Sequence, residues 1–279
     1  MIVVTGATGN IGRPLTQALA DAGQEVTAVS RHAAPVPAGV RHVVADLAAP
    51  DSLKPVLTGA KALFLLLSGD LHAVGANPAD VVRAAAQAGV RRLVLLSTQG
   101  VATRPFGTTR IKMLALEDVV RKSGLDWAIL RPGGFATNAL WWAESVRTRQ
   151  LVAAPFGDTG VPIIDPTDIA EVAAACLVDD RHTGGVYTLT GPEVITPRGQ
   201  TEAIAAALGT PVRFHELTRA EAKAYMTQSM PGELADDTLD ILSAPSEAEL
   251  QISPDVERVL GRVPRSFGEW AARNVEAFR

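Results

Sequence analysis

Short runs of apolar residues alternate with longer amphipathic stretches over the first two-thirds of the chain. The runs are rich in Val, Leu and Ile and mostly lack polar alternation, which is typical of strands buried on both faces of a sheet. They predict strands at residues 2–5, 25–30, 40–45, 62–67, 92–97 and 125–131. The stretches between them predict helices at residues 11–22, 78–88 and 110–122. This order is typical of an α/β fold with a doubly wound parallel sheet of the Rossmann type.

The pattern loosens after Pro132. It predicts further helices at residues 137–148, 166–179, 197–208, 218–230 and 267–278, and strands at 185–190 and 211–216. Residues 231–266 are rich in Pro, Ser and acidic side chains, so we expect part of this stretch to be loop or loosely packed chain. Residues 135–279 are therefore expected to form a smaller α/β lobe that binds substrate and is partly woven back into the sheet.

Composition and charge exclude several classes of protein. The 279 residues carry 26 basic and 30 acidic side chains, a net charge of -4, which does not suit a protein that binds nucleic acid through phosphates. The single cysteine, Cys176, excludes an internal disulfide, and no Cys/His spacing indicates a metal site. The longest apolar run, residues 172–178, is far too short to cross a membrane, so we expect a cytoplasmic protein.

A glycine-rich loop, TGATGNIGR at residues 5–13, follows the first predicted strand and opens the first predicted helix. Gly6 suits a tight turn, Gly9 a close approach of backbone to a pyrophosphate, and Gly12 close packing of helix on sheet. The helix N-terminus would face the phosphates. We therefore expect residues 1–134 to be an NAD(P)-binding domain whose loop contacts come from Gly6, Thr8, Gly9, Asn10, Ile11 and Gly12.

The end of the second strand favours NADP(H) over NAD(H). Sites specific for NAD carry a carboxylate here for the ribose 2′-hydroxyl, whereas this strand ends with Ser30 and Arg31. Arg31 suits a 2′-phosphate, and Ser30 offers another donor. At the end of the third strand, Asp46 and Leu47 either contact the adenine or, in the case of Asp46, cap the next turn. Leu67, Ser68 and Gly69 are expected beside the cofactor ribose.

Several further motifs resemble a known family. They are the loop GATGNIG with Arg31, ADL at 45–47, LST at 96–98, Lys112, LRPGGF at 130–135, IDPTDIA at 164–170 and YTLTGP at 187–192. Together they resemble the NmrA-like group of atypical short-chain dehydrogenases/reductases, in particular the NAD(P)H:quinone oxidoreductase type. The resemblance covers about residues 1–220.

The resemblance also exposes a missing catalytic residue. Short-chain dehydrogenases use a Tyr-x-x-x-Lys pair with an upstream Ser; Lys112 matches the lysine, but Thr108 stands where the tyrosine is expected. The two tyrosines, Tyr187 and Tyr225, lie far downstream. A threonine hydroxyl is too weak an acid to replace the phenol. An electron-poor acceptor such as a quinone takes hydride readily and can collect its proton from water, so reduction of a quinone or similar conjugated carbonyl is favoured.

The remaining candidates surround the expected nicotinamide. Lys112 could bind the nicotinamide ribose and add positive charge near a developing oxyanion, which makes it the candidate catalytic residue. Ser97 and Thr98 either bind the cofactor or satisfy the end of their strand. The turn formed by Pro132, Gly133, Gly134 and Phe135 should reach the nicotinamide. Phe106, Trp141 and Trp142 are candidate substrate contacts, although adjacent tryptophans on one helix cannot share a face.

Two functions remain in competition. The first is an NADPH-dependent reductase of a small molecule, possibly a quinone. The second is a non-catalytic NADP(H)-binding regulator with a protein partner, because the family resemblance includes redox sensors. A nucleotide-sugar epimerase or dehydratase shares the fold but normally needs the missing tyrosine.

Overall fold

The computed structural model describes residues 1–67 and 77–279, so the predicted site residues Ser68 and Gly69 lie outside the described residues. The chain forms two compact units. Unit 1 contains Met1–Pro132, Pro166–Leu189 and Asp255–Arg262, and unit 2 contains Gly133–Asp165, Thr190–Pro254 and Val263–Arg279. The predicted division of the chain into domains at residues 1–134 and 135–279 stays a prediction.

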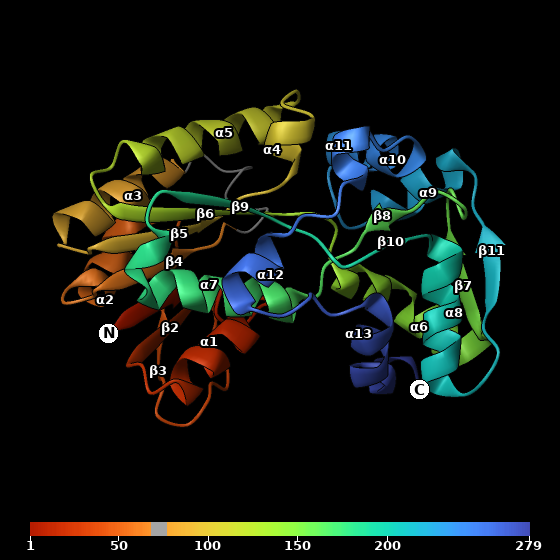
Figure 1. Ribbon diagram of the computed structural model, residues 1–279, viewed down its shortest axis with the longest axis horizontal. Helices are drawn as coiled ribbons and strands as arrows, with labels where there is room; N and C mark the ends of the chain where they lie inside the picture. The colour runs from red at the N-terminus through yellow and green to blue at the C-terminus, as the bar shows by residue number, and fades with distance from the viewer. Residues whose placement is uncertain (68–76) are drawn as a thin grey trace. The chain divides into compact units, whose positions relative to one another are not determined.

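Unit 1 is built on a seven-stranded parallel sheet with the order β3-β2-β1-β4-β5-β6-β9 (Figure 1). Its strands are β1 (Ile2–Thr5), β2 (Val26–Ser30), β3 (Arg41–Val44), β4 (Ala62–Leu65), β5 (Arg92–Leu96), β6 (Asp126–Pro132) and β9 (Gly185–Leu189). The strand order reverses between β1 and β4. This sheet confirms the predicted Rossmann-type α/β fold.

Helices cover both faces of this sheet (Figure 1). On one face lie α3 (Pro78–Gln87) and α5 (Thr108–Arg121), with the short η1 (Pro50–Leu53), α2 (Lys54–Leu57) and α4 (Gly100–Thr103). On the other face lie α1 (Gly12–Asp21) and α7 (Pro166–Val178), and α7 is followed by η4 (Asp180–His182). The last part of unit 1 is α12 (Asp255–Leu260), which packs against α7 and β9.

The unalternated apolar runs explain this double cover. Side chains alternate between the faces of a strand, so a strand between two helix layers needs apolar residues at every position. Val3 and Leu63 belong to the core cluster beneath α3 and α5. Val4 and Phe64, one position further along, are buried on the opposite face. Both faces of the sheet therefore contribute to the hydrophobic core.

Unit 2 combines short helices with two small sheets. It begins with η3 (Ala136–Trp142) and α6 (Ala143–Arg149), and its sheets pair β7 (Leu151–Ala154) with β11 (Arg213–Glu216) and β8 (Val161–Pro162) with β10 (Val194–Ile195). Its other helices are α8 (Pro197–Leu208), α9 (Arg219–Met226), α10 (Gly232–Ser243), α11 (Glu247–Leu250), α13 (Phe267–Arg273) and η5 (Val275–Phe278). The core of this unit includes Ile204, Phe267 and Trp270.

Residues 231–266 are loop in part, as predicted, and α10, α11 and α12 occupy the rest of this stretch. Ser246 caps α11 in a capping box with Glu249, and the buried Ala235 and Leu239 of α10 are four residues apart on one helix face. The single helix expected at residues 137–148 is instead the 3₁₀ helix η3 followed by α6.

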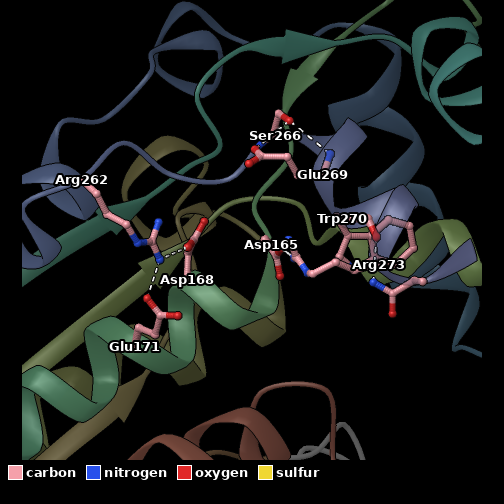
Figure 2. Close-up of polar contacts among 9 residues, drawn as sticks. Asp165, Asp168, Glu171, Arg262, Ser266, Glu269, Trp270 and Arg273 are labelled. Carbon is pink, nitrogen blue, oxygen red and sulfur yellow. Dashed lines mark hydrogen bonds and ion pairs between the residues drawn. The ribbon is translucent and has the colours of Figure 1, made fainter. Parts of the chain in front are cut away.

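Arginines near the C-terminus bind buried carboxylates in each unit (Figure 2). In unit 1, Arg262 pairs with Glu171 and donates at 2.6 Å to the fully buried Asp168, both on α7. In unit 2, Arg273 of α13 pairs with the buried Asp165. Removing one partner of a buried pair is costly, so these arginines anchor the C-terminal region to the buried core of each unit.

Candidate functional site

The glycine loop lies where the strand order reverses, which is where open α/β sheets bind ligands. The hydroxyl of Thr5, at the end of β1, donates to the carbonyl of Phe64 in β4 at 3.0 Å. Gly6 has a positive φ of 62°, and a Cβ at Gly12 would lie 2.1 Å from the carbonyl oxygen of Gly6. The backbone therefore closes more tightly here than any side chain would allow.

The N-terminus of α1 is open to an anion. Its N-cap, Ile11, makes no side-chain capping bond, and the first turn carries no acidic residue. Gly9 and Asn10 are exposed and Thr8 is partly exposed, whereas the side chain of Ile11 is buried, so Ile11 can offer only its backbone to a ligand. Unsatisfied N–H groups at such a terminus favour a phosphate. The loop therefore fits the pyrophosphate of a dinucleotide.

Arg13 is a site candidate that the sequence analysis missed. Its Nε donates to the carbonyl oxygen of Thr8 at 2.7 Å, which fixes the guanidinium beside the loop while the side chain remains exposed. The signal was a basic residue directly after the last glycine of the motif. A guanidinium held there can donate from its remaining nitrogens to a phosphate.

The residues expected at the adenosine end are partly engaged within the fold. Arg31 is exposed, but the Ser30 hydroxyl lies 2.7 Å from both the His32 carbonyl oxygen and His42 Nε2. Since a hydroxyl has one hydrogen, Ser30 would have to exchange a bond to donate to a 2′-phosphate. The carboxylate of Asp46 accepts the N–H of Ala48 at 2.9 Å, as the capping alternative requires.

Apolar residues near these strand ends belong to the core of unit 1. Leu47 and Leu67 are partly buried and pack against the cluster under α3 and α5. Each can present only its remaining exposed surface to a cofactor.

At the end of β5, Ser97 belongs to a buried cluster of charged side chains around Glu117. Glu117 of α5 is fully buried. It accepts hydrogen bonds from Ser97 Oγ at 2.6 Å, Arg131 Nη2 at 2.5 Å and Arg121 Nη2 at 2.8 Å. Burial opposes the charge of Glu117, but the bonds from Arg131 and Ser97 outweigh it and lower the pKa of this carboxyl. In the structure the Ser97 hydroxyl is used within the fold, as in the second of its two alternatives, because it donates to Glu117 at the end of β5.

Thr98 and Lys112 lie near this cluster. The Thr98 hydroxyl accepts the N–H of Gly100 at 3.3 Å at the start of α4. Lys112 is exposed on α5, five residues before Glu117. The bonds of Glu117 to Ser97 and Arg131 join α5 to the ends of β5 and β6. They therefore fix the position of the helix that carries Lys112 within unit 1.

Tyr187, the tyrosine of unit 1, does not replace the missing acid at this edge of the sheet. The hydroxyl of Tyr187, in the middle of β9, lies 2.8 Å from Nδ1 of His182, which precedes that strand. In a parallel sheet the residues before a strand lie at the edge opposite the glycine loop. Burial also raises the pKa of Tyr187. Tyr225 lies in unit 2, where its hydroxyl donates to the carbonyl oxygen of Trp141 at 3.3 Å.

The turn after β6 crosses from unit 1, with the buried Pro132, to unit 2, with Gly133, Gly134 and Phe135. Phe135 forms a parallel bridge with Ile164, in which Ile164 donates to Gly134 and accepts from Ala136. The N–H of Phe135 faces away from Ile164 in such a bridge. The partly buried Phe135 therefore has a backbone donor directed away from this pairing.

The aromatic candidates for substrate binding differ in exposure. Phe106, in the α4–α5 connection of unit 1, is 76% exposed. In unit 2, Trp141 is 43% exposed, whereas Trp142 packs against the core cluster. The 3₁₀ period of three explains this difference, because Trp142 shares a face with the buried Ala136 and Ala139. Phe106 and Trp141 therefore have free ring surface in their respective units.

Thr137 is a second residue that sequence reasoning missed. Its hydroxyl oxygen is buried and has no hydrogen-bond partner, which holds for no other buried side-chain N or O atom among the described residues. Buried polar groups are nearly always paired, so this hydroxyl is an exception within unit 2.

Comparison with known proteins now places the chain in a family. Residues 6–180 match the family described as NAD(P)H-binding. The chain belongs to that family. It is 37% identical to a (4-alkanoyl-5-oxo-2,5-dihydrofuran-3-yl)methyl phosphate reductase of Streptomyces griseus and 32% identical to an NAD(P)H azoreductase of Xenophilus azovorans; each alignment covers 100% of this chain and 99% of the relative.

A solved structure supports the same relationship. The NADPH-dependent quinone oxidoreductase of Escherichia coli, in complex with NADPH, has a TM-score of 0.79 and 25% identity, with 98% of this chain and 99% of that chain covered. These likenesses confirm the predicted relationship to the NmrA-like, quinone oxidoreductase type. The chain is an NAD(P)H-dependent oxidoreductase related to quinone oxidoreductases and azoreductases.

In the part of the chain that the structure describes, no helix has the length and apolar character needed to cross a membrane. Within residues 1–67 and 77–279 there is also no group of three or more His, Cys, Asp or Glu side chains that could hold a metal.

Proposed function

We propose that this protein is an NADPH-dependent reductase that transfers hydride to a quinone or a similar conjugated acceptor. The observation that carries the proposal is a complete dinucleotide-binding loop without a tyrosine at the expected catalytic position: Thr108 precedes Lys112 by four residues, and the hydroxyl of Tyr187 is engaged with His182. Bound NADPH would supply the hydride. Without a tyrosine at that position, the acceptor would stabilise the added electron pair itself and take its proton from water.

The names of the relatives support this acceptor class. A quinone, an azo compound and an acylated 5-oxo-2,5-dihydrofuran are all conjugated acceptors. In each, the electron pair that arrives with the hydride can be delocalised onto an oxygen or nitrogen atom. The shared property is conjugation, so we expect this protein to reduce a conjugated carbonyl more readily than a simple ketone.

The chain's own residues would bind and orient the reactants. The N-terminus of α1 and Arg13 would hold the pyrophosphate, and Arg31 would bind the 2′-phosphate. Lys112 would bind the nicotinamide ribose, while Phe135 would lie against the nicotinamide. Phe106 and Trp141 offer exposed rings on which a planar acceptor can stack.

The first experiment follows oxidation of NADPH by the purified protein with a benzo- or naphthoquinone, an azo dye and a simple ketone, each against a protein-free blank. We expect turnover with the conjugated acceptors and little with the ketone. If NADPH quenches tryptophan fluorescence but no acceptor is reduced, the non-catalytic regulator becomes the better assignment.

Cofactor preference has its own test. Arg31→Glu replaces attraction of the 2′-phosphate by repulsion, so NADPH affinity should fall at least about tenfold while NADH affinity changes little. Arg41→Glu, on the exposed first residue of β3, makes the same change in charge and should leave both affinities unchanged. Equal weakening of both cofactors by Arg31→Glu contradicts the proposed role of Arg31.

A further inference from the structure

Ser30 and His42 form a hydrogen-bonded pair on neighbouring strands of the large sheet. Ser30 is the last residue of β2 and is 8% exposed, whereas His42 is half-buried on the edge strand β3. The Ser30 hydroxyl oxygen lies 2.7 Å from Nε2 of His42 and 2.7 Å from the carbonyl oxygen of His32. Both contacts lie within unit 1, which also carries the glycine loop and Arg31.

These two contacts decide which atoms donate. A carbonyl oxygen can only accept, so the Ser30 hydroxyl gives its single hydrogen to the carbonyl of His32. The Ser30 oxygen must then accept a hydrogen from His42, which assigns a proton to Nε2 of the imidazole. His42 therefore holds the Ser30 oxygen in place, and the hydroxyl can change partner by turning its hydrogen alone.

The pair also lies beside the expected site of the 2′-phosphate. The N–H of Ala7 in the glycine loop donates to the carbonyl oxygen of Val29 at 3.1 Å, so the loop is fixed against the end of β2. Ser30 and the exposed Arg31 are the next two residues of the chain. In sites of this type the adenosine ribose of the dinucleotide reaches the end of this strand. We expect a phosphate bound by Arg31 to meet the hydroxyl of the adjacent Ser30.

We propose that His42 is a positioning residue for NADP(H), because it holds the Ser30 oxygen while the hydroxyl hydrogen turns from His32 to the 2′-phosphate; this inference rests on the proposed role of Arg31. The turn needs no movement of a heavier atom, and His32 is exposed, so water can bond to its released carbonyl. A hydroxyl that accepts a hydrogen bond is also a stronger donor, since neighbouring bonds polarise one another. NADH has a hydroxyl in place of this phosphate, so the pair favours binding of NADPH.

The test measures dissociation constants of NADPH and NADH by calorimetry for His42→Val, His42→Gln, Ser30→Ala and the double variant Ser30→Ala/His42→Val. Ser30→Ala should weaken NADPH binding at least about fivefold and His42→Val at least about threefold, with NADH changed less than about twofold. Valine suits a strand, so His42→Val should fold. His42→Gln keeps an N–H at the same number of bonds from the backbone and should retain most of the affinity. The double variant should bind NADPH no more weakly than Ser30→Ala alone, since His42 acts through Ser30. His215→Val, on β11 of unit 2, is the control and should change neither cofactor.

Several outcomes overturn the inference. Unchanged NADPH affinity in His42→Val, or equal weakening of both cofactors, shows that His42 does not position a group for the 2′-phosphate. Equal losses in the Val and Gln variants show that the hydrogen bond is not what matters. Losses that multiply in the double variant show that His42 acts independently of Ser30. If Arg31→Glu weakens both cofactors equally, the proposed phosphate site itself fails, and this result is distinct from a selective loss of NADPH in Arg31→Glu with an insensitive His42→Val variant.

Discussion

The buried carboxylate of Glu117 provides the sharpest test of how unit 1 is held together. Glu117→Gln keeps the size of the side chain but removes its charge and places an amide NH2 among donors. Arg131, whose side chain is 17% exposed, would then lose the negative charge with which it pairs. Arg121 would keep its ion pair with Asp118 at 3.2 Å, so the loss concerns mainly Arg131.

The expected cost follows from this burial. Removing one partner of a buried ion pair costs about 3–5 kcal/mol, and the remaining pair of Arg121 favours the lower end. A loss of about 3 kcal/mol corresponds to a melting temperature lower by about 6–12 °C. Glu202→Gln, at an exposed position of α8, is the matched control and should change stability by less than about 0.5 kcal/mol.

The lowered pKa of Glu117 also predicts how the stability of the protein changes with pH. Because the folded pKa of Glu117 is lowered, the unfolded chain binds more protons in the acidic range, and stability rises with pH there. The stability difference between the unchanged protein and Glu117→Gln should be complete above the ordinary pKa of a glutamate, 4.5. It should shrink as the pH falls through the lower folded value. Urea unfolding at several pH values measures this, and a difference below about 1 kcal/mol at neutral pH would refute the reasoning.

Three further predictions concern the loop, the lysine and the C-terminal region. Gly12→Ala should weaken NADPH binding more than about tenfold and cost about 1–3 kcal/mol, because its Cβ would meet backbone at 2.1 Å. Gly232→Ala, whose Cβ would meet only Thr227 Cγ2 at 4.0 Å, is the control in fluorescence titration and thermal melting. Lys112→Ala should lower NADPH affinity or turnover without lowering the melting temperature, since the side chain is exposed on a helix; unchanged kinetics would remove Lys112 from the site. Arg262→Met should lower stability by about 2–4 kcal/mol in urea unfolding, because the fully buried Asp168 loses a donor, and a loss near zero would contradict an anchoring role.

Much of unit 1 could be predicted because its signals are local. Strands buried on both faces must be apolar at every position, and the glycine loop must adopt a shape that excludes side chains. Unit 2 gave weaker signals. Its strands β8 and β10 have two residues each, too few to show a period, and the 3₁₀ helix η3 follows a period of three rather than 3.6.

The buried contacts of the site were harder to predict because they join residues distant in sequence. Ser97 and Glu117 are 20 residues apart, and no pattern along the chain shows that they meet. One signal was available: Glu117 lies in a stripe with Met113, Leu116 and Val120, where a charged residue on a buried helix face requires a partner. The unpartnered hydroxyl of Thr137 had no such signal along the chain.

The interrupted course of the chain limits how such a protein can diversify. Each unit is assembled from three separate segments, so no single stretch of gene encodes either one. A recombination event after residue 132 would replace α7 and β9 of unit 1 together with unit 2, and would bring foreign side chains against α1 and β6. Exchange of one whole unit between relatives would need several coordinated crossovers. Single substitutions are therefore a more accessible route of change for such a chain than domain shuffling.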